Sequence, residues 1–304
     1  MNTRVKLCGT ELANPVIPAS GTFGYGAEFA ALYDINCLGT FSFKGTTRLP
    51  RFGNPGPRIA EAPAGLLNSV GLQNPGVDAV IAEELPRLRE VFHKPVMANV
   101  CGFSVDEYVE VAAKLDSCPE VGWLEINISC PNVHGGGMGF GTSCESAAEV
   151  TREVRAAVKK PIIVKLTPNV TDIVSIARAC EKAGADGLSL INTLLAMRID
   201  PATRRPVLKN LTGGLSGPAV FPVALRMVWQ VYEAVGIPII GMGGVSSAED
   251  VIEMLLAGAD AVAMGTVLFA DPLAPVKALQ ELEAWMDAHG VKSVRELSGA
   301  VEVG

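Results

Sequence analysis

Short apolar runs rich in β-branched residues recur along the chain, and segments with the period of an amphipathic helix separate them. Eight of these runs have the length of a strand, at residues 15–19, 38–44, 95–100, 122–129, 161–166, 187–191, 238–241 and 261–264. The other segments predict helices at 77–91, 105–115, 147–158, 173–183, 219–235, 248–257 and 275–288, with a shorter one at 27–33. Strand and helix therefore alternate through the whole sequence.

This alternation predicts a parallel sheet covered by helices. Eight units close into a (β/α)8 TIM barrel, which is the fold we expect, although an open doubly wound sheet is also compatible. Against the open sheet, residues 20–26 lack the glycine spacing of a dinucleotide fingerprint. Residues 5–12 predict an N-terminal β-hairpin that plugs the bottom of the barrel. No linker or repeat divides residues 1–304, so we expect one domain.

Three connections are longer than the others, at residues 48–75, 131–143 and 193–218. Each follows a predicted strand, so all three belong to the face formed by the carboxyl ends of the strands. Barrel enzymes assemble their active sites at that face from several strands and loops. The long connections therefore predict a covered site at the C-terminal face.

Composition narrows the possible functions. The chain has 304 residues, 49% of them hydrophobic and only 19% charged, with a net charge of −7 and a pI near 5.1. An acidic chain without clustered Lys and Arg disfavours nucleic-acid binding. No signal core or membrane-length apolar run occurs, which indicates a cytoplasmic protein. We therefore expect no contact with nucleic acid or membrane.

The cysteine pattern is irregular. Seven cysteines without any Cys-x-x-Cys pair disfavour a disulfide framework, a zinc ribbon and a self-contained iron–sulfur cluster. Only His93, His134 and His289 are available as histidine ligands, so we expect no metal site. Redox chemistry, if the protein performs it, requires an organic cofactor.

Glycines follow the last two predicted strands. Gly243 and Gly244 come after the seventh, and Gly265 with Thr266 after the eighth. Such loops let backbone N–H groups approach a phosphate, at the position where TIM barrels commonly bind one. The simpler alternative is that these glycines only form tight turns.

Lysines and asparagines end several other strands. Lys44 and Lys165 each follow apolar residues, where an ammonium group is costly without an anionic or polar partner. They predict contact with an anion or cofactor, unless they reach solvent past the rim. Asn99, Asn127 and Asn192 with Thr193 can converge on a flat hydrogen-bonding heterocycle, although each could simply cap a loop.

Cys130 ends the fourth predicted strand, beside a glycine-rich loop. A buried cysteine is often an ordinary core residue. At a barrel mouth near cationic side chains, a thiol can instead act partly as thiolate, as a base or nucleophile. No histidine is clearly placed to activate it, which favours proton abstraction over protease-like chemistry.

Several strings, in this order, resemble class 1 dihydroorotate dehydrogenases. They are SGTFG at 20–24, KGTT at 44–47, NSVGLQNP at 68–75, ISCPNV at 128–133, INT at 191–193, LTGGLSG at 211–217 and GMGG at 241–244. The loop GGGMGFGT at 135–142 is similar to the NAD-linked 1B subclass. The sequence departs from that pattern at Ser143, Cys144 and Glu145, where the family has an acidic residue and a proline.

The resemblance implies one FMN at the barrel mouth and oxidation of dihydroorotate to orotate in pyrimidine biosynthesis. It makes Cys130 the base that takes the C5 proton, while the flavin N5 accepts hydride from C6, and it makes Lys44 a contact to both substrate and flavin. The implied substrate residues are Lys44, Asn68, Ser69, Val70, Gly71, Leu72, Asn127, Asn192 and Thr193. The implied FMN residues are Ser20, Lys44, Gly45, Asn99, Asn127, Lys165, Ile191, Gly217, Gly243, Gly244, Gly265 and Thr266.

The resemblance also implies a partner. In the 1B subclass a separate subunit with FAD and a [2Fe–2S] cluster passes electrons to NAD⁺, in an assembly of two catalytic and two electron-transfer subunits around a homodimer core.

Three alternative functions remain. They are a fumarate-linked or related pyrimidine-reducing flavoenzyme, a flavin enzyme acting on tRNA, which the acidic balance disfavours, and a non-enzymatic flavin- or phosphate-binding barrel.

Overall fold

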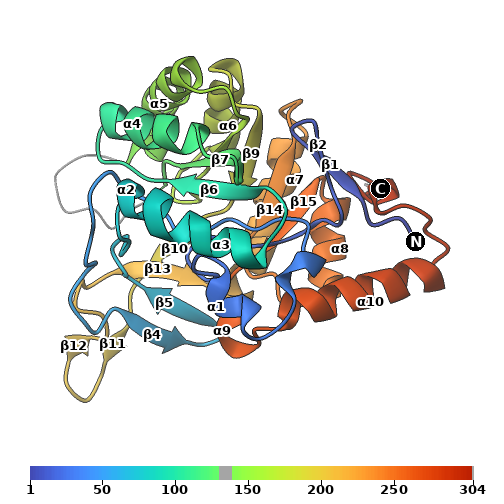
Figure 1. Cartoon of the computed structure of the whole chain (residues 1–304). Coiled ribbons are helices and arrows are strands. Elements are labelled where there is room, and N and C mark those ends of the chain that lie inside the picture. The colour runs from blue at the N-terminus through green and yellow to red at the C-terminus, as the bar shows by residue number, and fades with distance from the viewer. Residues whose placement is uncertain (130–138, 303–304) are drawn as a thin grey trace.

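The computed structural model describes residues 1–129 and 139–302. Its centre is a parallel sheet of seven strands in the order β3-β15-β14-β9-β8-β7-β6 (Figure 1). The strands are β3 (Val16–Pro18), β6 (Val96–Val100), β7 (Val121–Asn127), β8 (Ile162–Lys165), β9 (Gly187–Leu190), β14 (Ile239–Met242) and β15 (Ala261–Met264). All seven lie where the apolar runs predict strands.

The one remaining predicted strand, residues 38–44, forms only isolated bridges among the described residues, yet it lies between the two edges of this sheet. The Ser42 N–H donates to the Pro18 carbonyl oxygen of β3 at 3.0 Å, and the Phe43 N–H donates to the Met97 carbonyl oxygen of β6 at 3.0 Å. Bridges join Ser42 to Met97 and Thr46 to Val100 in parallel. The segment therefore closes the ring of strands, and the predicted barrel is confirmed.

Helices cover the outside of the sheet (Figure 1). Their apolar faces pack on the strands, and polar N-caps start several of them, including Ser104, Ser143, Asp172 and Ser247. With Ser143 as its cap, α5 begins at Cys144, three residues before the predicted start at 147. The helices are α1 (Ala27–Ala30), α2 (Val77–Ala79), α3 (Leu85–Val91), α4 (Val105–Asp116), α5 (Cys144–Ala157), α6 (Ile173–Lys182), α7 (Phe221–Tyr232), α8 (Ala248–Leu256), α9 (Val267–Ala270) and α10 (Ala274–Ala288).

Shorter helical turns connect these elements. A π-helical turn at Val80–Glu84 joins α2 to α3, so the predicted helix 77–91 is one continuous but irregular element. The 3₁₀ turns are Ile35–Cys37, Phe140–Thr142, Pro218–Val220 and Val294–Glu296.

The predicted N-terminal hairpin consists of β1 (Val5–Leu7) and β2 (Thr10–Leu12). It turns at Cys8 and Gly9, both with positive φ. Leu7 is fully buried, and its carbonyl oxygen accepts a hydrogen bond from the Trp123 Nε1 of β7 at 3.4 Å. The hairpin therefore fills the bottom of the barrel, as predicted.

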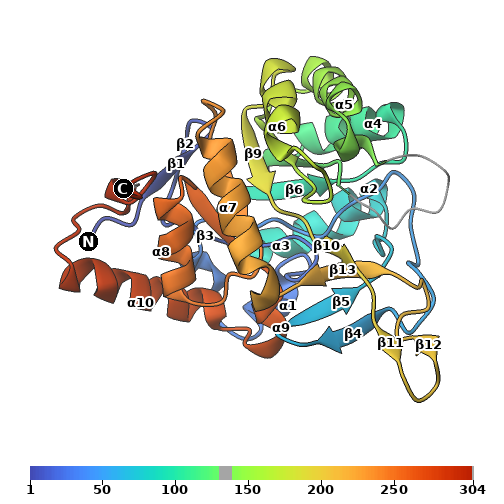
Figure 2. The ribbon, with the colours of Figure 1, turned by 180° about the vertical axis from the view of Figure 1, so that it is seen from behind.

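A second sheet, which the sequence pattern does not predict, covers the C-terminal face. Its order is β10-β13-β5-β4, and all its pairs are antiparallel. β4 (Ile59–Ala62) and β5 (Gly65–Asn68) come from the insertion at 48–75, whereas β10 (Leu194–Ala196) and β13 (Gly213–Ser216) come from that at 193–218. Figure 2 shows these strands side by side, with the hairpin of β11 (Ile199–Asp200) and β12 (Arg205–Pro206) projecting beyond them.

Two of the three long connections thus form one structure over the mouth of the barrel. Most of the third, at 131–143, lies outside the described residues. Within the part of the chain that the structure describes, no helix is long and apolar enough to cross a membrane.

Trp123 offers a test of the barrel core, because its side chain is fully buried and contacts the hairpin. We expect Trp123→Ala to lower the free energy of unfolding by about 3–5 kcal/mol through the cavity that it leaves. Phe52→Ala, which removes another aromatic side chain from a residue that is 94% exposed, serves as the control and should change it by only about 0.5 kcal/mol. Urea unfolding followed by circular dichroism measures both. Equal effects of the two substitutions would contradict the predicted packing.

Candidate active site

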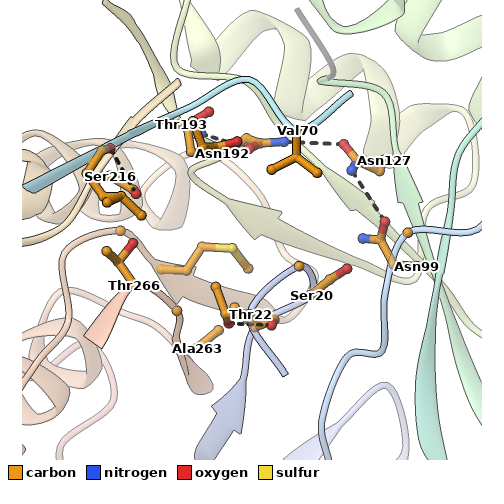
Figure 3. Close-up of a pocket in the computed structure, with 18 of the residues that line it drawn as sticks. Ser20, Thr22, Val70, Asn99, Asn127, Asn192, Thr193, Ser216, Ala263 and Thr266 are labelled. Atoms are coloured by element: carbon orange, nitrogen blue, oxygen red, sulfur yellow. Dashed lines mark hydrogen bonds between the residues drawn. The ribbon is translucent and has the colours of Figure 1, made fainter. Parts of the chain in front are cut away.

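A cavity opens at the carboxyl ends of the barrel strands, beneath the second sheet. Its lining comes from nearly every strand end and from β5 and β13 above. The lining residues are Ala19, Ser20, Gly21, Thr22, Lys44, Gly45, Ile59, Leu66, Asn68, Val70, Gly71, Leu72, Asn99, Asn127, Lys165, Ile191, Asn192, Thr193, Ser216, Met242, Gly243, Gly244, Ala263, Gly265, Thr266 and Phe269. Figure 3 shows Asn99, Asn127 and Asn192 along one side and Thr266 and Ala263 across from them.

The charge of this lining has one sign. Its titratable side chains are Lys44 and Lys165, and the described part of the lining holds no Asp, Glu, His, Cys or Tyr. A cavity walled by two ammonium groups and neutral amides attracts anions. Phosphate and carboxylate groups are therefore the ligands that it suits.

The loops after β14 and β15 supply unused backbone donors. The N–H groups of Gly243, Gly244, Gly265 and Thr266 have no hydrogen-bond partner among the described residues. Gly243 and Gly244 have φ of +121° and +80°, and a Cβ on Gly244 would lie 2.7 Å from the Phe221 backbone nitrogen. Donors exposed in this way at neighbouring loops fit a phosphate.

Lys165 ends β8 and points into the same cavity. The residue is only 6% exposed, and no hydrogen bond or ion pair joins its ammonium group to another residue within 1–129 or 139–302. A buried ammonium group is expensive without an anionic or hydrogen-bonding partner. The missing partner is best supplied by a ligand with acceptor atoms.

The asparagines form a continuous chain of hydrogen bonds. Asn127 Nδ2 donates to Asn99 Oδ1 at 3.3 Å, and Asn192 Nδ2 donates to Asn127 Oδ1 at 3.3 Å (Figure 3). Ser129 also donates to Asn127 Oδ1, from its backbone N–H at 3.3 Å and from its hydroxyl at 2.9 Å. The three amides predicted to converge therefore do so, and they hold one another in fixed orientations.

Below this chain lies Glu125, which the sequence analysis overlooked. Its carboxylate is 1% exposed and accepts hydrogen bonds from Ser42 Oγ at 2.8 Å, Asn99 Nδ2 at 2.5 Å and Ser189 Oγ at 2.8 Å. The signal was present, because a glutamate in the apolar run 122–129 needs polar partners inside the barrel.

The loop after β5 covers the cavity. Gly71 and Leu72 both have positive φ, at +79° and +56°, and Asn74 holds the loop by donating from Nδ2 to the Leu72 carbonyl oxygen at 2.7 Å and to Thr47 Oγ1 at 2.8 Å. Asn74 thereby ties this loop to the segment that carries Lys44.

Comparison with known proteins agrees with this geometry. Residues 2–286 match the family model described as dihydroorotate dehydrogenase. The chain belongs to the dihydroorotate dehydrogenase family. Relatives named "Dihydroorotate dehydrogenase B (NAD(+)), catalytic subunit" from Geobacillus kaustophilus and Pelobacter propionicus are each 55% identical to it, over 97% and 98% of this chain and 94% and 98% of their own length. The relative of the same name from Bacillus cytotoxicus is also 55% identical, over 97% of this chain and 96% of its own length.

Most residues that the family resemblance implies line the cavity. These are Ser20, Lys44, Gly45, Asn68, Val70, Gly71, Leu72, Asn99, Asn127, Lys165, Ile191, Asn192, Thr193, Gly243, Gly244, Gly265 and Thr266. Ser69 and Gly217 lie outside the lining. Ser69 is fully buried, and a Cβ on Gly217 would lie 2.7 Å from the Gly65 Cα, so Gly217 permits close packing beside β5.

Cys130 lies outside the described residues. The other six cysteines are Cys8, Cys37, Cys101, Cys118, Cys144 and Cys180, and none of these described thiols lines the cavity. Cys8, for example, donates to the Asp186 carbonyl oxygen at 3.2 Å, and its burial raises the pKa of the thiol to about 12. It is a structural, protonated thiol at the bottom of the barrel.

The lining also includes apolar residues that the sequence analysis did not single out, such as Ile59, Leu66, Met242 and Phe269. Ile59 and Leu66 belong to the unpredicted second sheet. Phe269 is 59% exposed and follows β15 in α9. Apolar side chains of this kind carry no recognisable signal in a single sequence.

Gly244 tests the phosphate end of the cavity. In Gly244→Ala the added Cβ would meet the Phe221 backbone nitrogen at 2.7 Å and the Gly217 oxygen at 2.8 Å, at a φ of +80° that alanine disfavours. We expect FMN affinity to fall about tenfold or more, because the loop has to move.

The control is Gly236→Ala, where the nearest atom, Glu181 Oε1, lies 3.6 Å away. FMN titration of apoprotein measures both affinities. Unchanged FMN binding in the Gly244 variant would remove this loop from the site.

Proposed function

We propose that this chain is the FMN-dependent catalytic subunit of an NAD⁺-linked dihydroorotate dehydrogenase. It oxidises dihydroorotate to orotate in pyrimidine biosynthesis. The observation that carries the proposal is the cationic, amide-lined cavity at the barrel mouth, in a chain 55% identical to relatives that bear this name. Residues 1–304 act as one FMN-binding domain in the cytoplasm.

The residues present fit FMN. The phosphate of FMN would accept from the free N–H groups of Gly243, Gly244, Gly265 and Thr266, and Lys165 would contact the flavin ring as its unpaired cation. Bound FMN supplies the hydride acceptor for the reaction. The full set that we assign to FMN is Ser20, Lys44, Gly45, Asn99, Asn127, Lys165, Ile191, Gly217, Gly243, Gly244, Gly265 and Thr266.

The substrate would occupy the part of the cavity beneath the covering loop. Dihydroorotate is a cyclic imide with a carboxylate, so it offers both donors and acceptors to amides and an anionic group to a lysine. Lys44, Asn127 and Asn192 line one continuous space with the loop at 68–72. We assign substrate contacts to Lys44, Asn68, Ser69, Val70, Gly71, Leu72, Asn127, Asn192 and Thr193.

Cys130 is the base that we assign to the C5 proton. The reaction removes a proton from C5 and a hydride from C6, which leaves the double bond of orotate. A base is required, and the described lining offers only two lysines. Cys130 directly follows Ser129, whose hydroxyl donates to Asn127 Oδ1 and accepts from Asn192 Nδ2. Cys130 is therefore next in sequence to a residue that contacts two of the proposed substrate amides.

A partner subunit completes the reaction. Relatives are named catalytic subunits of NAD⁺ enzymes, and such a subunit has a partner. We propose that the partner carries FAD and a [2Fe–2S] cluster, and that two catalytic chains form a homodimer core within a heterotetramer with two electron-transfer subunits.

The spectrum of the flavin tests this function. Anaerobic addition of dihydroorotate to the purified FMN-loaded chain should bleach the visible flavin band and yield orotate. NAD⁺ should restore the band only when the partner subunit is present. A flavin that stays oxidised would refute the proposal and favour a non-enzymatic flavin-binding barrel, and reoxidation by fumarate would favour the fumarate-linked alternative.

The Cys130 thiol gives a prediction about pH. A cysteine with an ordinary pKa of about 8.5 is mostly protonated near neutrality, so flavin reduction should accelerate as pH rises and thiolate forms. Cys130→Ala should keep FMN but lose nearly all reduction. Cys130→Ser should keep a remnant that grows in alkali. Stopped-flow bleaching at the wild-type rate in the alanine variant would exclude Cys130 as the base.

A further inference from the structure

Glu125 is a charged group inside the barrel that no step of the proposed reaction uses. It lies on β7, two residues before Asn127, and is 1% exposed. No Lys, Arg or His of the described residues lies within ion-pair distance of its carboxylate, which is held by hydrogen bonds alone. Burying a carboxylate in this way costs stability compared with an apolar residue of similar size. A specific role for the carboxylate explains its presence better than packing does.

The carboxylate determines the direction of the Asn99 amide. Asn99 Nδ2 lies 2.5 Å from Glu125 Oε2. If the amide were reversed, its oxygen would face a carboxylate oxygen at this distance, and both groups only accept hydrogen bonds. Asn99 Oδ1 is therefore turned toward its other neighbours, Asn127 Nδ2 at 3.3 Å and the Cys101 thiol at 3.4 Å.

The fixed orientation of Asn99 also fixes the amide of Asn127. Asn127 gives one N–H to Asn99, and its oxygen accepts from Ser129 and Asn192. The carbonyl oxygens of Asn99 and Asn127 are thus occupied. Each of these two amides keeps one N–H that no described residue accepts. Both residues line the cavity together with the Lys165 ammonium group.

Glu125 also fixes two other strand ends. Ser42 lies two residues before Lys44, and Ser189 lies three residues before Asn192. Their hydroxyls donate to opposite oxygens of the carboxylate, Ser42 to Oε2 and Ser189 to Oε1, both at 2.8 Å. One side chain thereby joins β7 to β6, to β9 and to the closing segment at residue 42.

We propose that Glu125 is a positioning residue for the flavin. Its carboxylate orients Asn99 and, through it, Asn127, so that this wall of the cavity offers N–H donors to the acceptor-rich pyrimidine edge of the ring. The proposal rests on the proposed function for the identity of the ligand, but its tests measure FMN binding and not turnover.

The first test removes the acceptor. We expect Glu125→Leu to weaken FMN binding to the apoprotein about tenfold or more, whereas Glu125→Gln stays within about threefold of wild type. Glutamine keeps an oxygen for Asn99 and can donate to Ser189. The control is Thr151→Val, which deletes another fully buried hydrogen bond, from Thr151 Oγ1 to the Ala147 oxygen on α5, away from the cavity. It should lower the melting temperature without weakening FMN binding.

The second test reverses the hydrogen bond between the two side chains. Asn99→Asp places two carboxylates together and should lower the melting temperature. Adding Glu125→Gln should restore stability, because the glutamine amide can donate to the new aspartate. FMN binding should not return, since position 99 then offers no N–H to the ring. This pair decides the question even if Glu125→Leu does not fold.

Two results would overturn the proposal. One is wild-type FMN affinity in folded Glu125→Leu. The other is recovery of FMN affinity together with stability in the double variant, which would make Asn99 and Glu125 purely structural. A wild-type chain that binds FMN without oxidising dihydroorotate would instead refute the proposed function and leave this inference standing.

Discussion

A single buried carboxylate sets the geometry of the cavity. Glu125 receives hydrogen bonds from Ser42, Asn99 and Ser189, which come from three separate segments of the barrel wall. Because a carboxylate only accepts hydrogen bonds, its neighbours have to donate them. The hydrogen bonds from Asn192 to Asn127, from Asn127 to Asn99 and from Asn99 to Glu125 therefore all run in one direction. Ser42 lies two residues before Lys44, and Ser189 lies three residues before Asn192. Asn99 binds the carboxylate directly, and Asn127 lies two residues after Glu125. The orientations of the asparagines that line the cavity thus depend on the carboxylate beneath them.

The cavity above this layer has two differently built ends. At one end, the loops after β14 and β15 offer backbone N–H groups, and glycines allow a ligand to approach them closely. At the other end, side-chain amides and Lys165 offer directed donors. The covering sheet of β4, β5, β13 and β10 lies over both. This division suits a ligand with a phosphate at one end and a hydrogen-bonding ring at the other, as FMN has.

The sequence predicts the parts of this molecule that depend on local pattern. Parallel strands buried on both faces are continuous apolar runs, so the apolar runs predict every strand of the barrel. This includes the segment at 38–44, which takes the predicted place in the barrel although it forms only isolated bridges. The second sheet was not predicted, because its pairing joins insertions far apart in the chain, as between Asn68 and Gly214. Glu125 stands out in the sequence only as a glutamate inside an apolar run, because its partners Ser42, Asn99 and Ser189 come from other strands, which no local pattern pairs with it. Ser69 and Gly217 belong to family motifs but lie outside the cavity lining, a distinction that no local pattern in the sequence reveals.

A crystal structure with FMN and orotate would test the account most directly. It should show the phosphate on the N–H groups of Gly243, Gly244, Gly265 and Thr266, the pyrimidine edge of the flavin on Asn99, Asn127 and Lys165, and orotate between the ring and the loop at 68–72. The Cys130 sulfur should lie beside C5 of orotate. A flavin bound elsewhere, or turned so that its phosphate meets the asparagines, would contradict the account.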